Sequence, residues 1–386
     1  MAKREIRFGI IGCGLMGREF ASAAARWCHL LDLDFEPRIV AVCDVNAAAM
    51  TWFERNVPTV GLTTTDYRKI LAHADVDAVY CAVPHNLHAQ IYVDTIRAGK
   101  HLFGEKPFGI DLEANQAILD AIHQHPRVFV RCSSQFPFFP GAYRIAQWIR
   151  EGRFGRIIEV EAGFWHSSDL NPLKPINWKR RVATNGAYGC MGDLGLHVLH
   201  IPLRVGWRPK SVRALLSKIV TERPNQSGNM VPCETWDNAI LACDVETGDQ
   251  AFPMLLSTKR IAPGHANTWF IRVLGTEFSA EFTTKNPKRL ASLPYTAGGE
   301  QAWHAVDVSY RSAYPAITGG IFGFGFSDAI LQMWAAFCDE LVNGPQMRQS
   351  FYCATPLETA ESHRLFTAAL ESQRTGQTVR VAHLVD

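Results

Sequence analysis

Residues 6–17 read IRFGIIGCGLMG, a short run with strand character followed at once by the glycine pattern Gly12-x-Gly14-x-x-Gly17. In a strand, turn and helix, such glycines permit a tight turn, a close approach of the backbone to a pyrophosphate, and close packing of the helix. The run 21–27 has the composition of that helix, whose N-terminus attracts negative charge. The pattern occurs by chance in ordinary loops, but its position after the first strand predicts a dinucleotide site. The residues expected at the cofactor are Gly12, Gly14, Leu15, Met16 and Gly17.

The N-terminal third alternates strand-like and helix-like segments. Its strand-like runs are residues 6–11, 39–43, 78–83, 100–103 and 128–132, and the polar stretch 28–37 lengthens the path to the second run. This alternation favours a parallel sheet covered by helices. Prolines and aromatic clusters begin after Cys132, so we expect a Rossmann NAD-binding domain over 1–132 and a substrate-binding and oligomerisation domain over 133–386.

The second part of the chain has a different pattern. Strand-like runs cover 156–164, 211–219, 238–244, 253–259, 268–274 and 279–282, without regular helices between them. This predicts a large, mostly antiparallel open sheet. Helix-like segments at 329–342 and 356–374 follow, the latter ending before Gly376. The expected fold class is therefore α/β, with an N-terminal Rossmann domain and a C-terminal α+β domain.

Composition limits the classes of partner. A chain of 386 residues with 47% hydrophobic and 20% charged residues is long enough for two buried cores. A formal net charge of +2 gives no concentrated basic surface, so we expect no nucleic acid partner. The ten cysteines form no C-x-x-C pair and no zinc-like pattern, which favours free thiols and no metal. Without a signal peptide or a run of ~20 apolar residues, we expect a cytoplasmic protein away from membranes.

Two further segments follow predicted strands of the first domain. Asp44 can accept hydrogen bonds from the adenosine ribose and would repel a 2′-phosphate, which favours NAD over NADP, although it could instead cap the next helix. The segment 84–88 lies at the carboxyl edge of the sheet, where ligands bind, although turn chemistry or helix packing would also explain it. The residues expected beside the nicotinamide are Pro84, His85, Asn86 and His88.

A series of motifs resembles the Gfo/Idh/MocA family, named for glucose-fructose oxidoreductase, inositol dehydrogenase and rhizopine catabolism. They are the glycine loop, Pro84–His88, Ala98–His101, Glu105-Lys106-Pro107 and Gly192–His197. The resemblance covers the whole chain but is weak over about 210–325. It implies an NAD-dependent oxidoreductase of carbohydrate metabolism with Glu105 and Lys106 near the cofactor, a cis Lys106–Pro107 bond, and a homodimer or homotetramer.

The resemblance also implies that Lys106 and His197 face the substrate and that Asp193 supports them. Hydride transfer from an alcohol leaves a hydroxyl proton, and removal by a general base contributes about 10²–10⁴-fold. With an ordinary pKa near 6.5, histidine is suited to accept it. We therefore expect His197 as base and Lys106 as the group that orients the hydroxyl. Asp193 and His197 share a helix face at i, i+4, with His200 nearby, although a capping aspartate and packed histidines would give the same pattern.

Aromatic and basic residues before that helix are expected to line the substrate pocket. Aromatic faces suit a carbohydrate ring, and the cations could hold a carboxylate, phosphate or sulfonate, although a solvated basic loop is equally consistent. His200 stands where many family members carry aspartate, and Pro202 should kink or shorten the helix. The expected substrate residues are Trp165, His166, Trp178, Lys179, Arg180, Arg181 and His200.

The leading hypothesis is an NAD-dependent dehydrogenase that oxidises a secondary hydroxyl of a sugar, sugar derivative or cyclitol. The alternative is an NAD-dependent glycoside hydrolase that transiently oxidises its sugar, including an anionic sugar, because the same lysine and histidine would serve it. A non-catalytic sensor is disfavoured, since it would need neither Lys106 nor His197.

Overall fold

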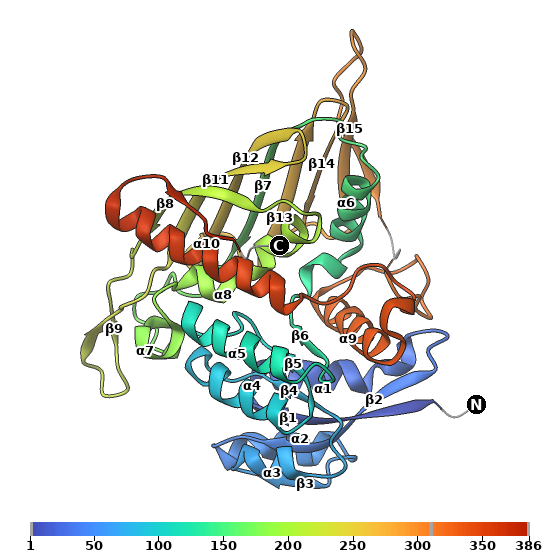
Figure 1. Cartoon of the computed structure of the whole chain (residues 1–386), viewed down its shortest axis with the longest axis vertical. Helices are drawn as coiled ribbons and strands as arrows, with labels where there is room; N and C mark the ends of the chain where they lie inside the picture. The colour runs from blue at the N-terminus through green and yellow to red at the C-terminus, as the bar shows by residue number, and fades with distance from the viewer. Residues whose placement is uncertain (1–2, 309–311, 384–386) are drawn as a thin grey trace. The chain divides into compact units, whose positions relative to one another are not determined.

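The computed structural model describes residues 3–308 and 312–383, and the chain forms two compact units (Figure 1). The first consists of Met1–Gly109, Glu113–Phe138 and Tyr310–Pro356, and the second of Ile110–Leu112, Phe139–Ser309 and Leu357–Asp386. Apart from the short segment 110–112, the chain passes from the first unit to the second between Phe138 and Phe139, close to the expected break after residue 132. The segment 310–356, however, belongs to the first unit and not to the C-terminal domain as expected.

The first unit contains a six-stranded parallel sheet in the order β3-β2-β1-β4-β5-β6. Its strands are β1 (Arg4–Ile11), β2 (Phe35–Cys43), β3 (Leu62–Thr64), β4 (Ala78–Cys81), β5 (His101–Gly104) and β6 (Val130–Cys132). Its helices are α1 (Leu15–Ala25), η1 (Trp27–His29), α2 (Ala47–Asn56), α3 (Tyr67–Ala72), η2 (His85–Leu87), α4 (His88–Arg97), α5 (Leu112–Gln124) and η3 (Phe136–Phe138). The predicted parallel sheet is confirmed, and the strand order reverses beside β1, where open α/β sheets bind ligands.

Buried aromatic packing explains why 310–356 joins the first unit. The helix α9 (Phe326–Asn343), followed by η5 (Gly344–Gln346), presents the fully buried Trp334, whose ring centroid lies 4.8 Å from that of Phe8 on β1. Phe337 of α9 stacks on Phe103 of β5 at 4.5 Å. Aromatic side chains bury ~150–250 Å² each, so α9 covers this sheet as part of its core.

The second unit contains a nine-stranded sheet in the order β16-β15-β14-β13-β7-β12-β11-β8-β17. The strands are β7 (Ile157–Trp165), β8 (Pro209–Ser217), β11 (Asn238–Thr247), β12 (Gln250–Lys259), β13 (Thr268–Gly275), β14 (Phe278–Thr283), β15 (Arg289–Pro294), β16 (His304–Asp307) and β17 (Val379–Arg380), with β9 (Glu222–Pro224) and β10 (Met230–Pro232) forming a separate pair. Every neighbouring pair of the large sheet is antiparallel except β7 with β12. The expected mostly antiparallel sheet is confirmed.

One face of this sheet is covered and the other is open. Buried and exposed residues alternate along β11, as period-two side chains on a half-covered sheet must. The helices of this unit are α6 (Pro140–Arg150), η4 (Trp178–Arg180), α7 (Val182–Asn185), α8 (Cys190–Arg204) and α10 (Pro356–Thr375), and α6 and α8 contact sheet strands directly. Gly376 follows α10 with φ 70°, as expected of a C′ residue.

The helix α8 begins at Cys190, three residues before Asp193. Its N-cap is Gly189, with φ 58°, and a Cβ there would lie 2.6 Å from the backbone nitrogen of Trp236. Only glycine fits this turn. Pro202 lies in the last turn, and the helix ends at Arg204. Among the described residues, no helix is long and apolar enough to cross a membrane.

Candidate active site

The glycine loop between β1 and α1 has space at one of its three glycines. Gly12 has φ 100°, and a Cβ there would lie 2.2 Å from the carbonyl oxygen of Ala82. A Cβ on Gly17 would lie 2.2 Å from the carbonyl oxygen of Gly12. Gly14, the N-cap of α1, has no atom within 4 Å of the same position. Two glycines are thus needed for packing, and the middle one leaves the helix N-terminus open, so the loop fits a pyrophosphate.

Asp44, directly after β2, closes this loop. Its Oδ2 accepts from the backbone N–H of Cys13 at 2.8 Å, and its Oδ1 accepts from that of Asn46 at 2.9 Å. The N-cap of α2 is Asn46, whose side chain accepts from Ala48 N–H, so the capping alternative for Asp44 is wrong. Burial and the charge of Asp44 raise the pKa of Cys13 to about 12. The thiol of Cys13 therefore stays neutral. Leu15 is exposed and Met16 half-buried at the start of α1.

The segment after β4 has one misassigned residue. His88 is fully buried, its Nε2 lies 3.1 Å from the carbonyl oxygen of Val83, and its ring stacks on Tyr92 at 4.8 Å. The expectation that His88 contacts the cofactor is wrong, because its ring packs inside the first unit. His85 is also buried, whereas Pro84 is half-buried and Asn86 exposed.

Lys106 follows Glu105, whose side chain and carbonyl oxygen both accept hydrogen bonds from tyrosines. The Tyr80 hydroxyl donates to Glu105 Oε1 at 2.8 Å, and the Tyr92 hydroxyl donates to the Glu105 carbonyl oxygen at 2.8 Å. The Glu105 side chain therefore points into the core of the first unit. Lys106 is half-buried, and its bond to Pro107 is cis, as predicted.

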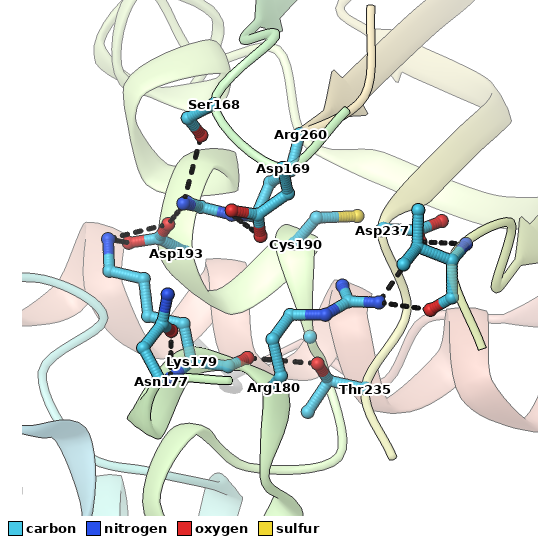
Figure 2. A network of polar contacts seen from close by, with 12 residues as sticks. Ser168, Asp169, Asn177, Lys179, Arg180, Cys190, Asp193, Thr235, Asp237 and Arg260 are labelled. Atoms are coloured by element: carbon cyan, nitrogen blue, oxygen red, sulfur yellow. Dashed lines mark hydrogen bonds and ion pairs between the residues drawn. The ribbon is translucent and has the colours of Figure 1, made fainter. Parts of the chain in front are cut away.

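In the second unit, α8 holds Asp193 in an ion-pair network (Figure 2). Lys179 Nζ lies 3.0 Å from both carboxylate oxygens of Asp193, and Arg260 Nη1 pairs with Oδ2. Asp193 is 1% exposed and lies within the helix, so it is not the N-cap. Two cations therefore stabilise its charged form in a setting where an unpaired carboxylate would be costly.

His197, one turn after Asp193, is held from two directions. Its ring meets Phe164 edge-on, with centroids 5.4 Å apart, and its carbonyl oxygen accepts from Trp269 Nε1 at 2.8 Å. Phe164 lies on β7 and Trp269 on β13, and the two residues are paired across the strands. Both therefore project from the sheet face that α8 covers.

Trp165 projects from the opposite face of the sheet, since successive residues of a strand alternate. Its Nε1 donates to Ser257 Oγ at 2.8 Å, and its ring meets Phe270 at 4.9 Å. The expectation that Trp165 lines the pocket is therefore wrong, and Phe164 takes the place beside His197. His166 returns to that side, where its ring lies 4.7 Å from Phe164.

Burial, together with nearby cations, keeps the imidazole of His166 neutral. Burial, followed by the charges of Arg260 and Lys179, lowers the pKa of His166 from 6.5 to about 4, against the opposing effect of Asp193. A neutral imidazole can both donate and accept a hydrogen bond.

Arg260, directly after β12, was not recognised from the sequence. Its Nε lies 3.0 Å from Asp169 Oδ2, and the same guanidinium pairs with Asp193. Burial alone would raise the pKa of Asp169, but the charges of Arg260 and Lys174 hold that pKa below its ordinary value. A lone arginine after a strand gives no signal, because both acidic partners are remote in sequence.

Lys179 and Arg180 are neighbours on η4 but pair with different acids (Figure 2). Arg180 is fully buried, with Nη2 3.0 Å from Asp237 Oδ2 and 2.9 Å from the Val220 carbonyl oxygen. The expectation that Arg180 binds an anionic substrate is wrong, because its guanidinium lies inside the second unit. Arg181 is exposed. The Lys179 ammonium lies 5.4 Å from the centroid of the Trp178 ring, which is half-buried.

His200 also differs from expectation. It is fully buried, with Nε2 2.9 Å from Arg204 Nη2 and 4.0 Å from Glu358 Oε2. Arg204 in turn pairs with Glu358 at 2.6 Å. The expectation of a substrate contact is wrong, because these charged neighbours hold His200 on the side of α8 that faces α10. Within the described residues, no cluster of three His, Cys, Asp or Glu side chains could hold a metal ion.

Comparisons with known proteins agree with this architecture. Residues 6–132 match the oxidoreductase family with an NAD-binding Rossmann fold, and residues 143–281 match the Gfo/Idh/MocA C-terminal domain. The chain belongs to the Gfo/Idh/MocA family. Family membership makes the first unit an NAD-binding domain and the chain a member of an oxidoreductase family.

Two curated dehydrogenases are similar to this chain. The levoglucosan dehydrogenase of Pseudarthrobacter phenanthrenivorans is 28% identical over 236 residues, which are 58% of this chain and 57% of that protein. The inositol 2-dehydrogenase of Rhizobium meliloti is 26% identical over 262 residues, 67% of this chain and 71% of that protein. The match thus spans little more than half of the levoglucosan dehydrogenase.

The solved structure of a levoglucosan dehydrogenase in complex with NADH and levoglucosan superposes with a TM-score of 0.87. The two chains are 22% identical, and the match covers 99% of this chain and 100% of that one. This likeness establishes a common fold.

Proposed function

We propose that the protein is an NAD-dependent dehydrogenase that oxidises a secondary hydroxyl of a sugar, sugar derivative or cyclitol. The observation that carries the proposal is the buried pair of Asp193 and His197 on α8, held by Lys179, Arg260 and Phe164. The open helix N-terminus at Gly14 supports the cofactor assignment. The names of the two curated relatives, which act on levoglucosan and inositol, support the substrate class.

In this proposal, the N-terminus of α1 at Gly14 and the Asp44 carboxylate would hold NAD, which would supply the hydride acceptor. His197 takes the hydroxyl proton, and Lys106 orients the hydroxyl and stabilises the negative charge that develops on its oxygen. Asp193 supports His197 from one helical turn away and stays charged because Lys179 and Arg260 compensate it. After the exclusion of Trp165, Arg180 and His200, the proposed substrate contacts are His166, Trp178 and Lys179. The exposed Arg181 is available to an anionic substituent.

The preference for NAD over NADP is proposed from Asp44. Its carboxylate lies at the end of β2 and is fixed by the backbone N–H groups of Cys13 and Asn46. A fixed negative charge there suits ribose hydroxyls and repels a 2′-phosphate.

We further propose a cytoplasmic homo-oligomer, a dimer or tetramer. The cysteines are all free, as in a reducing compartment. On the open face of the large sheet, Leu215 is 57% exposed and is paired across the strands with Ile240, and Leu255 lies on the next strand. An apolar patch on a sheet supports burial against another copy.

The test is a screen of sugars and cyclitols for NADH formation, with His197→Gln and Lys106→Ala as variants. The proposal predicts turnover that falls about 10²–10⁴-fold in His197→Gln while NAD binding persists in that variant. Absence of turnover across a broad panel despite bound NAD would refute it. Release of a chromogenic aglycone without accumulation of NADH would identify a glycosidase instead.

A further inference from the structure

The Arg260 side chain pairs with both Asp169 and Asp193. Its three guanidinium nitrogens donate to three residues: Nε to Asp169 at 3.0 Å, Nη1 to Asp193, and Nη2 to Ser168 Oγ at 3.2 Å. Asp169 and Ser168 belong to the loop that follows β7 and carries His166, whereas Asp193 belongs to α8. A single buried side chain therefore ties the His166 loop to the helix of His197.

The backbone of Arg260 is fixed as firmly as its side chain. Its N–H donates to the Asp237 carbonyl oxygen at 2.8 Å, and its carbonyl oxygen accepts from Asp169 N–H at 3.0 Å. The guanidinium thus extends from a fixed point at the end of β12, and its planar fork sets the direction of both carboxylates.

The charges explain why an arginine is needed here. Asp169 and Asp193 are 0% and 1% exposed, and two buried carboxylates near one another repel unless a cation lies between them. A lysine ammonium supplies one compact charge and cannot reproduce the two directions of a guanidinium.

We infer that Arg260 is a positioning residue for the proposed dehydrogenation, because it fixes Asp193 relative to the loop that carries His166. The inference rests on the proposed function and adds to it a residue that lies outside the recognised motifs. Arg260 acts through Asp193 and Asp169 and is not assigned any contact with the reacting atoms.

The experiment compares Arg260→Lys and Arg260→Ala with Arg204→Lys. Arg204 is the matched control because it anchors the other end of α8 through a buried pair with Glu358. We expect Arg260→Lys to lower kcat/KM about 10- to 100-fold, since small misplacements near reacting groups have effects of this size, with NAD affinity unchanged. Arg204→Lys should lower the melting temperature but leave kcat and KM unchanged.

Two readouts separate positioning from general destabilisation. Guanidinium ions at millimolar concentration should restore part of the activity of Arg260→Ala, because the space that the side chain leaves has the right acceptors. In an NMR titration of the same variant, the pKa of His166 should rise toward its ordinary value, because Arg260 is the largest of the charges that lower it and Lys179 and Asp193 remain.

Wild-type kcat and KM in Arg260→Lys would overturn the inference. So would a loss of activity that guanidinium does not restore and that leaves the His166 titration unchanged. If Arg260→Ala does not fold, the inference is tested by comparing kcat and KM of Arg260→Lys with those of Arg204→Lys. If the wild-type protein oxidises no sugar or cyclitol, the proposed function fails, and an unchanged His166 titration in Arg260→Ala would separately refute the link between Arg260 and the loop.

Discussion

Replacing Gly14 with alanine should separate cofactor binding from folding. Gly14 has φ −71° and ψ −159°, which alanine can adopt, and a Cβ there meets no atom within 4 Å. The free energy of unfolding should therefore change by no more than about 0.5 kcal/mol. A methyl group in the path of the pyrophosphate should remove one charge-assisted hydrogen bond, worth about 1.5–3 kcal/mol. At ~1.4 kcal/mol per tenfold, NAD should bind roughly 10- to 150-fold more weakly.

The matched control is Gly17→Ala, which should behave in the opposite way. Its Cβ would lie 2.2 Å from the Gly12 carbonyl oxygen, a backbone atom that cannot turn aside. Overpacking costs about 1–3 kcal/mol. This cost equals or exceeds the ~1 kcal/mol that alanine gains over glycine in a helix. Calorimetric titration with NAD and urea unfolding measure the two effects. Wild-type NAD affinity in Gly14→Ala would refute the placement of the pyrophosphate at this loop.

Three further predictions concern the second unit. Asp237→Asn should lower the free energy of unfolding by about 3–5 kcal/mol in urea titrations, because it leaves the Arg180 charge buried and unpaired; a change below 1 kcal/mol would contradict a buried ion pair. Stability should fall as pH falls from 6.5 toward 4, by up to ~3 kcal/mol from His166, because only the unfolded chain binds its proton there. His166→Gln should lose less over that window, and an equal loss would exclude His166 as the source. Leu255→Glu should shift the protein toward monomers in size-exclusion chromatography, and an unchanged elution volume would place the interface elsewhere.

The parallel sheet of the first unit could be predicted because its signals are local. The glycine loop and the apolar runs lie within short windows, and burial on both faces leaves near-continuous hydrophobic stretches. Elements without such a pattern were missed. The strand β3 has three residues, and all four residues of β16 are exposed. Their pairing depends on the rest of the sheet and not on their own sequence.

The site was predicted less completely, because its geometry depends on strand register and on remote partners. Phe164 and Trp165 are adjacent aromatic residues, and composition cannot tell which one faces α8. A register shift of one residue would exchange them. For the run Lys179 to Arg181, composition likewise cannot tell which cation is buried. Asp193 and Asp237 decide which of these cations are buried, and both are supplied by other elements.

The two ion pairs of η4 show how this short turn becomes a fixed part of the site. The Asn177 side chain caps it by accepting from Lys179 N–H at 2.9 Å, and successive side chains of a 3₁₀ turn diverge widely. Lys179 therefore reaches α8 while Arg180 reaches the residue just before β11. Because both cations are paired, the turn is held from opposite sides, and Asp193 keeps its lysine partner without any contribution from a ligand. Asp193, one helical turn before His197, is thus compensated by protein cations alone, which supports the proposal that His197 takes the hydroxyl proton.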